Sequence, residues 1–292
     1  MRGLENLISS RRIPATLEAP LIRDSSSLNT FTKLFGKYGL DRWIIGINTL
    51  NNPMGNISAD PIVIGHLIQS MLGVESIPHI VVSVENRFTL PRWLIGACIL
   101  GINNLLILGG DVGIEGSISY SDALAMIRGF EEGNIVVDGQ LYKTSPKKFY
   151  LGGVLIQNRR DEHKRVLYKL GEGIRFFQTQ VTFEPDRLLT ILSELDREYD
   201  GDDPIPILVS VVPYLNKRIM EILGGGAIDS SLEKYGAMTD EEYVSHLSVM
   251  INSLLDYCEK LDSVKLGIHV IPIQWRDESV SNTTLLLSNI TG

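Results

Sequence analysis

The stretch from Asn103 to Asp111, which reads NNLLILGGD, decides the fold. Four apolar residues in a row end in two glycines and an acid. An apolar run that is bounded by turn-forming residues is typical of a strand buried on both faces, as in a parallel sheet. Asp111 then follows the carboxyl end of that strand, where ligands bind in parallel α/β proteins. Two interpretations of Asp111 stay open at this point, a functional acid or a cap of the next helix.

The same order of strand and helix repeats along the chain. Eight strand candidates alternate with helical segments, and a small hairpin that turns at Asp138-Gly139 is inserted after the fourth unit. Eight such units in 292 residues match a (β/α)8 TIM barrel, so we predict an α/β fold with a single barrel domain over residues 1–292. A doubly wound open sheet is the competing arrangement, but the first strand ends in Glu-Ala-Pro without phosphate-binding glycines. The predicted strands cover residues 15–20, 42–48, 78–84, 103–108, 149–156, 176–183, 205–212 and 265–273.

The composition excludes several classes of partner. The net charge is −8 and no cluster of lysine or arginine stands out, so we expect neither nucleic acid nor an anionic membrane as a partner. Residues 1–14 carry charges throughout, which argues against a signal peptide. Residues 93–110 lack charge, but glycines and Asn103-Asn104 break this run, and we interpret it as a helix end followed by a buried strand. Cys98 and Cys258 lie in apolar segments without metal-ligand spacing, which indicates reduced thiols in a cytoplasmic protein.

Polar residues gather at the predicted carboxyl ends of the strands, where a barrel carries its chemistry. Two carboxylates in one pocket can take different pKa values, so that one of them acts as a general acid. Amides suit a flat nitrogen heterocycle, because such a ring offers both donors and acceptors. Neither a histidine-rich metal cluster nor a Ser-His-Asp set is present in this group. Its members are Glu18, Asn48, Thr49, Asp111, Gln157, Asn158, Gln180, Gln274 and Arg276.

Four segments, taken in order, resemble the methylenetetrahydrofolate reductases, which are flavin-dependent TIM barrels. Leu17-Glu18-Ala19-Pro20 is similar to the family's first strand, with its glutamate and proline. Ile77-Pro78-His79-Ile80 is similar to its Pro-His strand. Residues 101–111 resemble the family's Gly-Ile segment that ends in Arg-Gly-Asp, and residues 169–183 resemble its Lys-x-x-x-Gly segment with Thr-Gln and a later Phe. Each motif is short, but the ordered series spans most of the chain, as in a divergent member of the family.

The resemblance implies roles for particular residues. Glu18 would be the general acid that protonates the substrate as its five-membered ring opens, and Asp111 the acid where flavin and pterin meet. The substrate-binding positions are Asp111, Gln180 and Arg276. The cofactor-binding positions are Thr49, His79, Gly110, Asp111, Glu162 and Lys169.

The activity that the resemblance implies belongs to one-carbon metabolism and methionine biosynthesis. It is the reduction of methylenetetrahydrofolate, or of a methanopterin-like carrier, to the N5-methyl form. The implied cofactor is FAD, and NAD(P)H or another reductant is the implied electron donor. The partners are a reduced pterin substrate and either a second copy of the chain or a reductase partner subunit.

One departure from the family bears on the cofactor. Gly109 stands where the family has the arginine that helps to hold the flavin diphosphate, and Arg159 or Arg165 is a candidate replacement. FMN, or no flavin at all, is therefore an alternative to FAD. Two other functions also stay open, a flavin-free pterin-binding barrel of the methyltransferase or lyase class and a non-catalytic partner subunit. Without the resemblance we interpret His79 as structural, and His269 as a residue of the core or the barrel interior.

Overall fold

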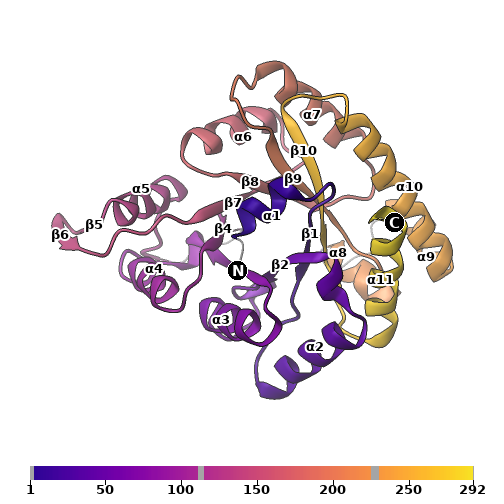
Figure 1. Cartoon of the computed structure of the whole chain (residues 1–292), viewed down its shortest axis with the longest axis horizontal. Helices are drawn as coiled ribbons and strands as arrows, with labels where there is room; N and C mark the ends of the chain where they lie inside the picture. The colour runs from indigo at the N-terminus through magenta and orange to yellow at the C-terminus, as the bar shows by residue number, and fades with distance from the viewer. Residues whose placement is uncertain (1–2, 111–114, 225–229, 292) are drawn as a thin grey trace.

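A computed structural model describes residues 3–110, 115–224 and 230–291, and eight parallel strands close into a barrel (Figure 1). Around the barrel the strands follow the order β1-β10-β9-β8-β7-β4-β3-β2. The predicted α/β TIM barrel is therefore confirmed. The barrel strands are β1 (Ala15–Glu18), β2 (Ile44–Thr49), β3 (Glu75–Val81), β4 (Asn104–Leu108), β7 (Tyr150–Leu155), β8 (Phe176–Val181), β9 (Ile205–Val211) and β10 (Val264–Val270).

Amphipathic helices cover the outside of the barrel and bury its outer apolar face (Figure 1). Several of them begin at a side-chain cap, as at α5, where Ser119 accepts a hydrogen bond from the backbone N–H of Asp122. The helices are α1 (Leu4–Ser10), α2 (Ser25–Lys37), α3 (Pro61–Leu72), α4 (Thr89–Ile99), α5 (Tyr120–Glu131), α6 (Glu162–Gly171), α7 (Asp186–Glu198), α8 (Lys217–Leu223), α9 (Ser230–Gly236), α10 (Asp240–Cys258) and α11 (Asp277–Thr291).

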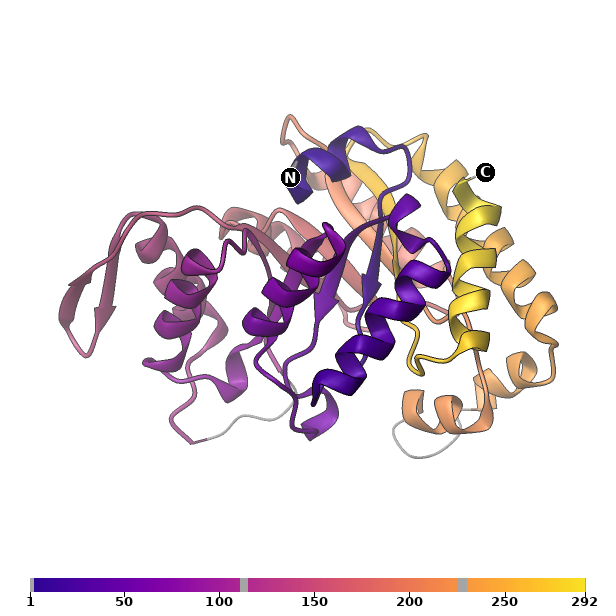
Figure 2. The same cartoon turned by 60° about the horizontal axis from the view of Figure 1, so that its bottom comes forward.

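The short helix α1 closes the amino end of the barrel (Figure 2). Leu4 and Ile8 are fully buried and pack on the first inward-facing side chains of the strands, which include Phe176. Space for the Phe176 ring exists because β7 has Gly152 beside it, where an added Cβ would lie 2.3 Å from the ring. This apolar layer leaves the carboxyl end, or mouth, as the open end of the barrel.

The predicted hairpin insertion is confirmed as β5 (Asn134–Val137) and β6 (Gln140–Lys143). Asp138 and Gly139 both have positive φ, 52° and 77°, which is the backbone of a type I′ turn. The hairpin projects from the side of the barrel beyond α5, away from the mouth (Figure 2).

Several boundaries differ from the prediction for physical reasons. β3 begins at Glu75 and not at Pro78, because buried partners satisfy its polar start. Asn104 Nδ2 donates to Glu75 Oε2 at 3.0 Å, and the backbone N–H of Ser76 donates to Gln69 Oε1 at 3.3 Å. Helices α1 and α11 were not predicted.

The charge-free run over residues 93–110 divides into the end of α4 and strand β4, as predicted. Within the described residues, no helix is both long and apolar enough to cross a membrane. Cys258 is buried and Cys98 is partly buried, and both are free thiols.

Candidate functional site

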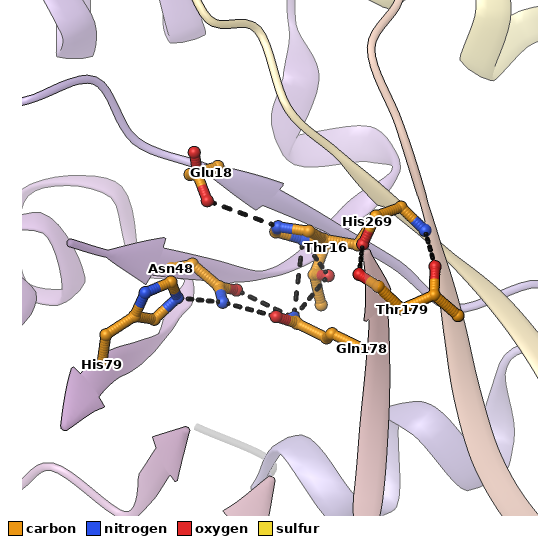
Figure 3. A network of polar contacts seen from close by, with 8 residues as sticks. Thr16, Glu18, Asn48, His79, Gln178, Thr179 and His269 are labelled. Carbon is orange, nitrogen blue, oxygen red and sulfur yellow. Dashed lines mark hydrogen bonds and ion pairs between the residues drawn. The ribbon is translucent and has the colours of Figure 1, made fainter. Parts of the chain in front are cut away.

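A layer of polar side chains crosses the interior of the barrel just below its mouth (Figure 3). In each strand the side chains alternate between the inside and the outside of the barrel, so a strand contributes at most one side chain to a given layer. The layer consists of Thr16 on β1, Asn48 on β2, His79 on β3, Gln178 on β8 and His269 on β10. All five side chains are buried, and each has hydrogen-bonding partners within the layer.

The centre of this layer is a pair of amides. Asn48 Nδ2 donates to Gln178 Oε1 at 2.8 Å, and Gln178 Nε2 donates back to Asn48 Oδ1 at 3.1 Å. On one side of the pair, Asn48 Nδ2 lies 2.8 Å from His79 Nε2. On the other side, Gln178 Nε2 lies 3.4 Å from Thr16 Oγ1, which in turn lies 2.9 Å from His269 Nδ1. The polar chain therefore runs from β3 to β10 through the barrel.

Burial keeps His79 uncharged. The imidazole is 8% exposed, and desolvation lowers its pKa from 6.5 to about 4. The Glu18 carboxylate partly opposes this shift in pKa, and His269 adds to it. At neutral pH His79 is thus a neutral ring with one donor and one acceptor nitrogen.

Glu18 lies at the carboxyl end of β1, one layer above Thr16. Its side chain is 22% exposed, and its Oε2 atom lies 3.9 Å from His269 Nε2. The carboxyl group therefore contacts the buried layer on one side and is open to the mouth on the other (Figure 3). A group in this position can exchange a proton with a ligand bound at the mouth.

Gln180 and Arg276, the other predicted contacts to substrate, lie at the same end of the barrel. Gln180 is exposed near the end of β8, within an irregularity in the register between β8 and β9. Its backbone carbonyl accepts a hydrogen bond from Gln157 Nε2 at 3.0 Å, which fixes the end of the strand. Arg276 is exposed in the turn between β10 and α11. Asp111, predicted as catalytic and as a ligand of both substrate and cofactor, lies outside the described residues.

Most of the predicted cofactor-binding side chains already have partners within the chain. Thr49 is buried and its hydroxyl donates to the carbonyl of Pro61 at 2.8 Å. Glu162 is buried at the start of α6, where Oε1 accepts from the backbone N–H of Ile156 at 3.0 Å. Lys169 Nζ donates to the carbonyl of Val154 at 2.6 Å. Burial lowers the pKa of Lys169, and the charge of Glu162 opposes that shift.

These contacts leave part of each group's hydrogen-bonding capacity unused, so the flavin site that the resemblance implies stays a prediction. Glu162 Oε2 is buried without a hydrogen-bond partner, the Lys169 ammonium has two further hydrogens, and the Thr49 hydroxyl can still accept. Among the described positions only Gly110 is exposed with its backbone open. Gly109 supplies no charge. Arg165, one candidate replacement for the family's arginine, has its Nε atom 3.9 Å from Glu162 Oε2.

The other candidate, Arg159, lines a groove of about 360 Å³ between the loop after β7 and helix α7. Arg187 lines the same groove and donates to Asn158 Oδ1 at 3.1 Å. The groove lies beside the mouth, because Gln157 lines the groove and also donates to the carbonyl of Gln180 at the end of β8. Within the described part of the chain, no group of His, Cys, Asp and Glu side chains could hold a metal ion.

Glu18, Asn48 and His79 were predicted from the sequence as site residues, whereas Thr16 and Gln178 were not. The available signal was the run Phe176-Phe177-Gln178-Thr179-Gln180, in which polar residues interrupt a strand that is otherwise buried. His269 was interpreted as core or barrel interior, and the structure places it there with 2% exposure.

Comparisons with known proteins add solved structures only, since no family model and no curated protein matches this chain. One similar structure is that of an uncharacterized protein from Clostridium thermocellum that binds two copies of 5-methyl-5,6,7,8-tetrahydrofolic acid. It is 18% identical, with a TM-score of 0.74, over 99% of this chain and 98% of that one. A second, from Aquifex aeolicus VF5, is 9% identical with a TM-score of 0.52, over 99% and 96% of the two chains. At these identities the likeness shows a shared barrel fold over the full length of both chains.

Proposed function

We propose that this barrel binds a reduced folate at its mouth and reduces its methylene group to the N5-methyl form, with Glu18 as the proton donor. The observation that carries the proposal is the position of Glu18. Its carboxyl group is open to the mouth, while the buried side faces the nitrogen of His269 at 3.9 Å. The resemblance of the first strand and the folate ligand of the Clostridium thermocellum protein support the same assignment.

The chemistry needs one proton and one hydride. Glu18 gives its proton to N10 of the pterin substrate as the bond between N10 and the methylene carbon breaks, which leaves an iminium at N5. A hydride from a two-electron donor such as NAD(P)H then reduces this iminium carbon to the methyl group, and the donor leaves oxidised. The chain must position the substrate, exclude water and return a proton to Glu18.

Gln180 and Arg276 are the proposed substrate contacts. An amide can donate to and accept from the edge of the pterin ring, as Gln180 is free to do from its exposed place on β8. The guanidinium of Arg276 suits the carboxylate groups of a folate. Asp111 keeps its role as a prediction.

The hydride comes from FAD or directly from NAD(P)H. Direct transfer is the alternative because Gly109 supplies no charge for a flavin diphosphate. On the same observation, the second candidate function is a flavin-free barrel that binds a reduced pterin without reducing it. A partner copy or a partner subunit stays part of the proposal.

Substitution of Glu18 by glutamine tests the function. We expect Glu18→Gln to bind 5-methyltetrahydrofolate within about threefold of the unaltered chain, measured by calorimetry, since the substitution keeps shape and hydrogen-bonding capacity. Formation of 5-methyltetrahydrofolate from methylenetetrahydrofolate and NADH, followed anaerobically by chromatography, should fall by about 10²–10⁴-fold, the usual contribution of a general acid. Glu241→Gln, on the exposed first turn of α10, is the matched control.

The outcomes separate the candidates. Normal turnover by Glu18→Gln would remove Glu18 from the mechanism. An unaltered chain that binds the folate but forms no product with NADH or with reduced flavin would be a pterin-binding barrel of the second kind. Failure of the unaltered chain to bind the folate would refute both.

A further inference from the structure

The polar layer below the mouth joins two histidines through groups whose donor and acceptor roles constrain one another. An amide nitrogen can only donate and an amide oxygen can only accept, whereas a hydroxyl or a neutral imidazole can do both. The role of each atom can therefore be followed from His79 on β3 to His269 on β10. The nitrogen that faces Glu18 is the last member of this chain (Figure 3).

The first step concerns His79. Asn48 Nδ2 has two hydrogens and two neighbours, Gln178 Oε1 at 2.8 Å and His79 Nε2 at 2.8 Å. Because the amide nitrogen donates to both, His79 Nε2 must present a lone pair. The proton of this neutral ring then resides on Nδ1.

The second step concerns Gln178. Its Nε2 atom donates to Asn48 Oδ1 at 3.1 Å and directs its other hydrogen toward Thr16 Oγ1 at 3.4 Å and His269 Nδ1 at 3.5 Å. The hydroxyl of Thr16 accepts this hydrogen, so its own hydrogen is available for His269 Nδ1 at 2.9 Å. Two donors thus converge on Nδ1, which must be unprotonated to receive them.

We propose that this layer fixes His269 in the tautomer with its proton on Nε2 and thereby makes His269 the positioning residue for Glu18. The Nε2–H group then points at Glu18 Oε2 across 3.9 Å. The positive end of this group orients the Glu18 carboxyl group toward the barrel axis. The inference rests on the proposed function only in that Glu18 is taken as the proton donor.

One other arrangement satisfies the same partners. If both amides were turned over, Asn48 Oδ1 would accept from His79 Nε2–H, and Gln178 Oε1 would accept from Thr16. Thr16 would then accept from His269 Nδ1–H, and Nε2 would face Glu18 as an acceptor. The two arrangements predict opposite tautomers for both histidines, so one measurement decides between them.

That measurement is long-range ¹H–¹⁵N NMR of the full chain with labelled histidine, at about pH 8.5, well above the ordinary histidine pKa. The spectrum of His269→Asn identifies the His269 signals among those of the 5 histidines. We expect an unprotonated Nδ1 and a protonated Nε2 on His269. A protonated Nδ1 in the unaltered chain would overturn the inference.

Thr16→Val removes the hydroxyl that donates to Nδ1, and Thr16→Ser keeps it. We expect the valine variant to show both tautomers of His269 and the serine variant to show one. If Thr16→Val does not fold, judged by near-UV circular dichroism, Gln178→Met removes the donor one step earlier in the chain. An unchanged single tautomer in the folded valine or methionine variant would also overturn the inference.

The kinetic test separates positioning from general stability. With methylenetetrahydrofolate and NADH, we expect Thr16→Val to lower kcat about tenfold, which corresponds to roughly 1.4 kcal/mol, and to leave KM within about twofold. Thr16→Ser should restore turnover. Lost tautomer control with unchanged kcat would overturn the positioning role. The expected tautomer in a chain that reduces no folate would refute the proposed function and leave the assignment of His269 in place.

Discussion

Glu18 and the buried layer beneath it show how a barrel can place one carboxyl group at its mouth. β1 ends at Glu18, so no further residue of that strand covers the side chain. His269 lies one layer below Glu18, because its neighbour in the sheet register is Thr16. The shorter of the two contacts to the buried imidazole nitrogen Nδ1 thus comes from the strand that also carries the acid.

Two adjacent glycines at the end of β4 differ in what they tolerate. Gly110 has a φ of +85°, and a Cβ added there would lie 1.9 Å from Ser83 Oγ and 2.9 Å from Val81 Cγ1. No heavy atom lies within 4 Å of a Cβ added at Gly109. Glycine is therefore required by the backbone at one position only.

This difference predicts the effect of alanine at each position. We expect Gly110→Ala to lower the free energy of unfolding by about 1–3 kcal/mol, through backbone strain and overpacking. Gly109→Ala should change it by less than about 0.5 kcal/mol, as for an exposed site. Urea unfolding followed by tryptophan fluorescence measures both. Equal losses would show that the end of β4 adapts more than the structure implies.

The substitution Gly109→Arg tests the cofactor. It shows whether the arginine of the resembled family restores flavin binding, measured as the absorbance of bound flavin.

At the scale of elements, helix α1 precedes the first strand and packs on the amino end of the barrel. Its residues Leu4, Leu7 and Ile8 fill the amino end of the barrel. There they pack on apolar side chains of the strands, which are Ile45, Ile77, Leu106, Phe176 and Leu208. The spacing of three and four residues is the usual apolar stripe of a helix. This helix is short, so its stability depends on that packing and not on its intrinsic propensity.

We therefore expect Ile8→Ala to lower the free energy of unfolding by about 2–5 kcal/mol, the range for truncating a fully buried aliphatic side chain. Asn6→Ala, on the exposed side of the same helix, is the control and should be nearly neutral. Denaturant titration compares the two. A loss for Ile8→Ala no larger than that of its control would mean that α1 does not seal the barrel.

The elements that could be predicted are those whose pattern is local. Apolar runs bounded by turn residues gave the barrel strands, and Asp138-Gly139 gave the hairpin turn. The start of β3 could not be predicted, because Glu75 and Ser76 are polar and their partners, Asn104 and Gln69, come from other elements. The same reason explains the missed part of the site. Gln178 is recognisable as functional only once β2 and β10 bring Asn48 and His269 to it.

At the scale of the whole molecule, the closed barrel ties its interior chemistry to its global stability. His79 is neutral when folded because burial lowers its pKa to about 4, whereas in the unfolded chain the value returns to 6.5. Between these values the unfolded chain binds more protons than the folded one, so stability rises with pH. The contribution is fully lost once the pH falls below about 4.

We expect this group to remove about 3 kcal/mol of stability between about pH 6.5 and pH 4, from a shift of 2.5 units at 1.36 kcal/mol each. His79→Gln should flatten the dependence in that window, because it removes the group whose pKa burial lowers. Urea unfolding at several pH values checks this. An unaltered slope in His79→Gln would show that other groups dominate acid unfolding.

Because α1 packs on the amino end of the barrel, the two ends of the barrel differ in access to the interior. In the described part of the chain α1 packs across the amino end of the barrel, so we expect ligands to reach the polar layer from the mouth. The first described residues lie at the opposite end (Figure 2). A chain anchored to a sensor chip or a bead through its beginning would hold every approach route facing the buffer. Immobilised and freely diffusing protein should then bind folate equally well, whereas anchoring through cysteines engineered beside Gly109 or Gln180 should obstruct binding.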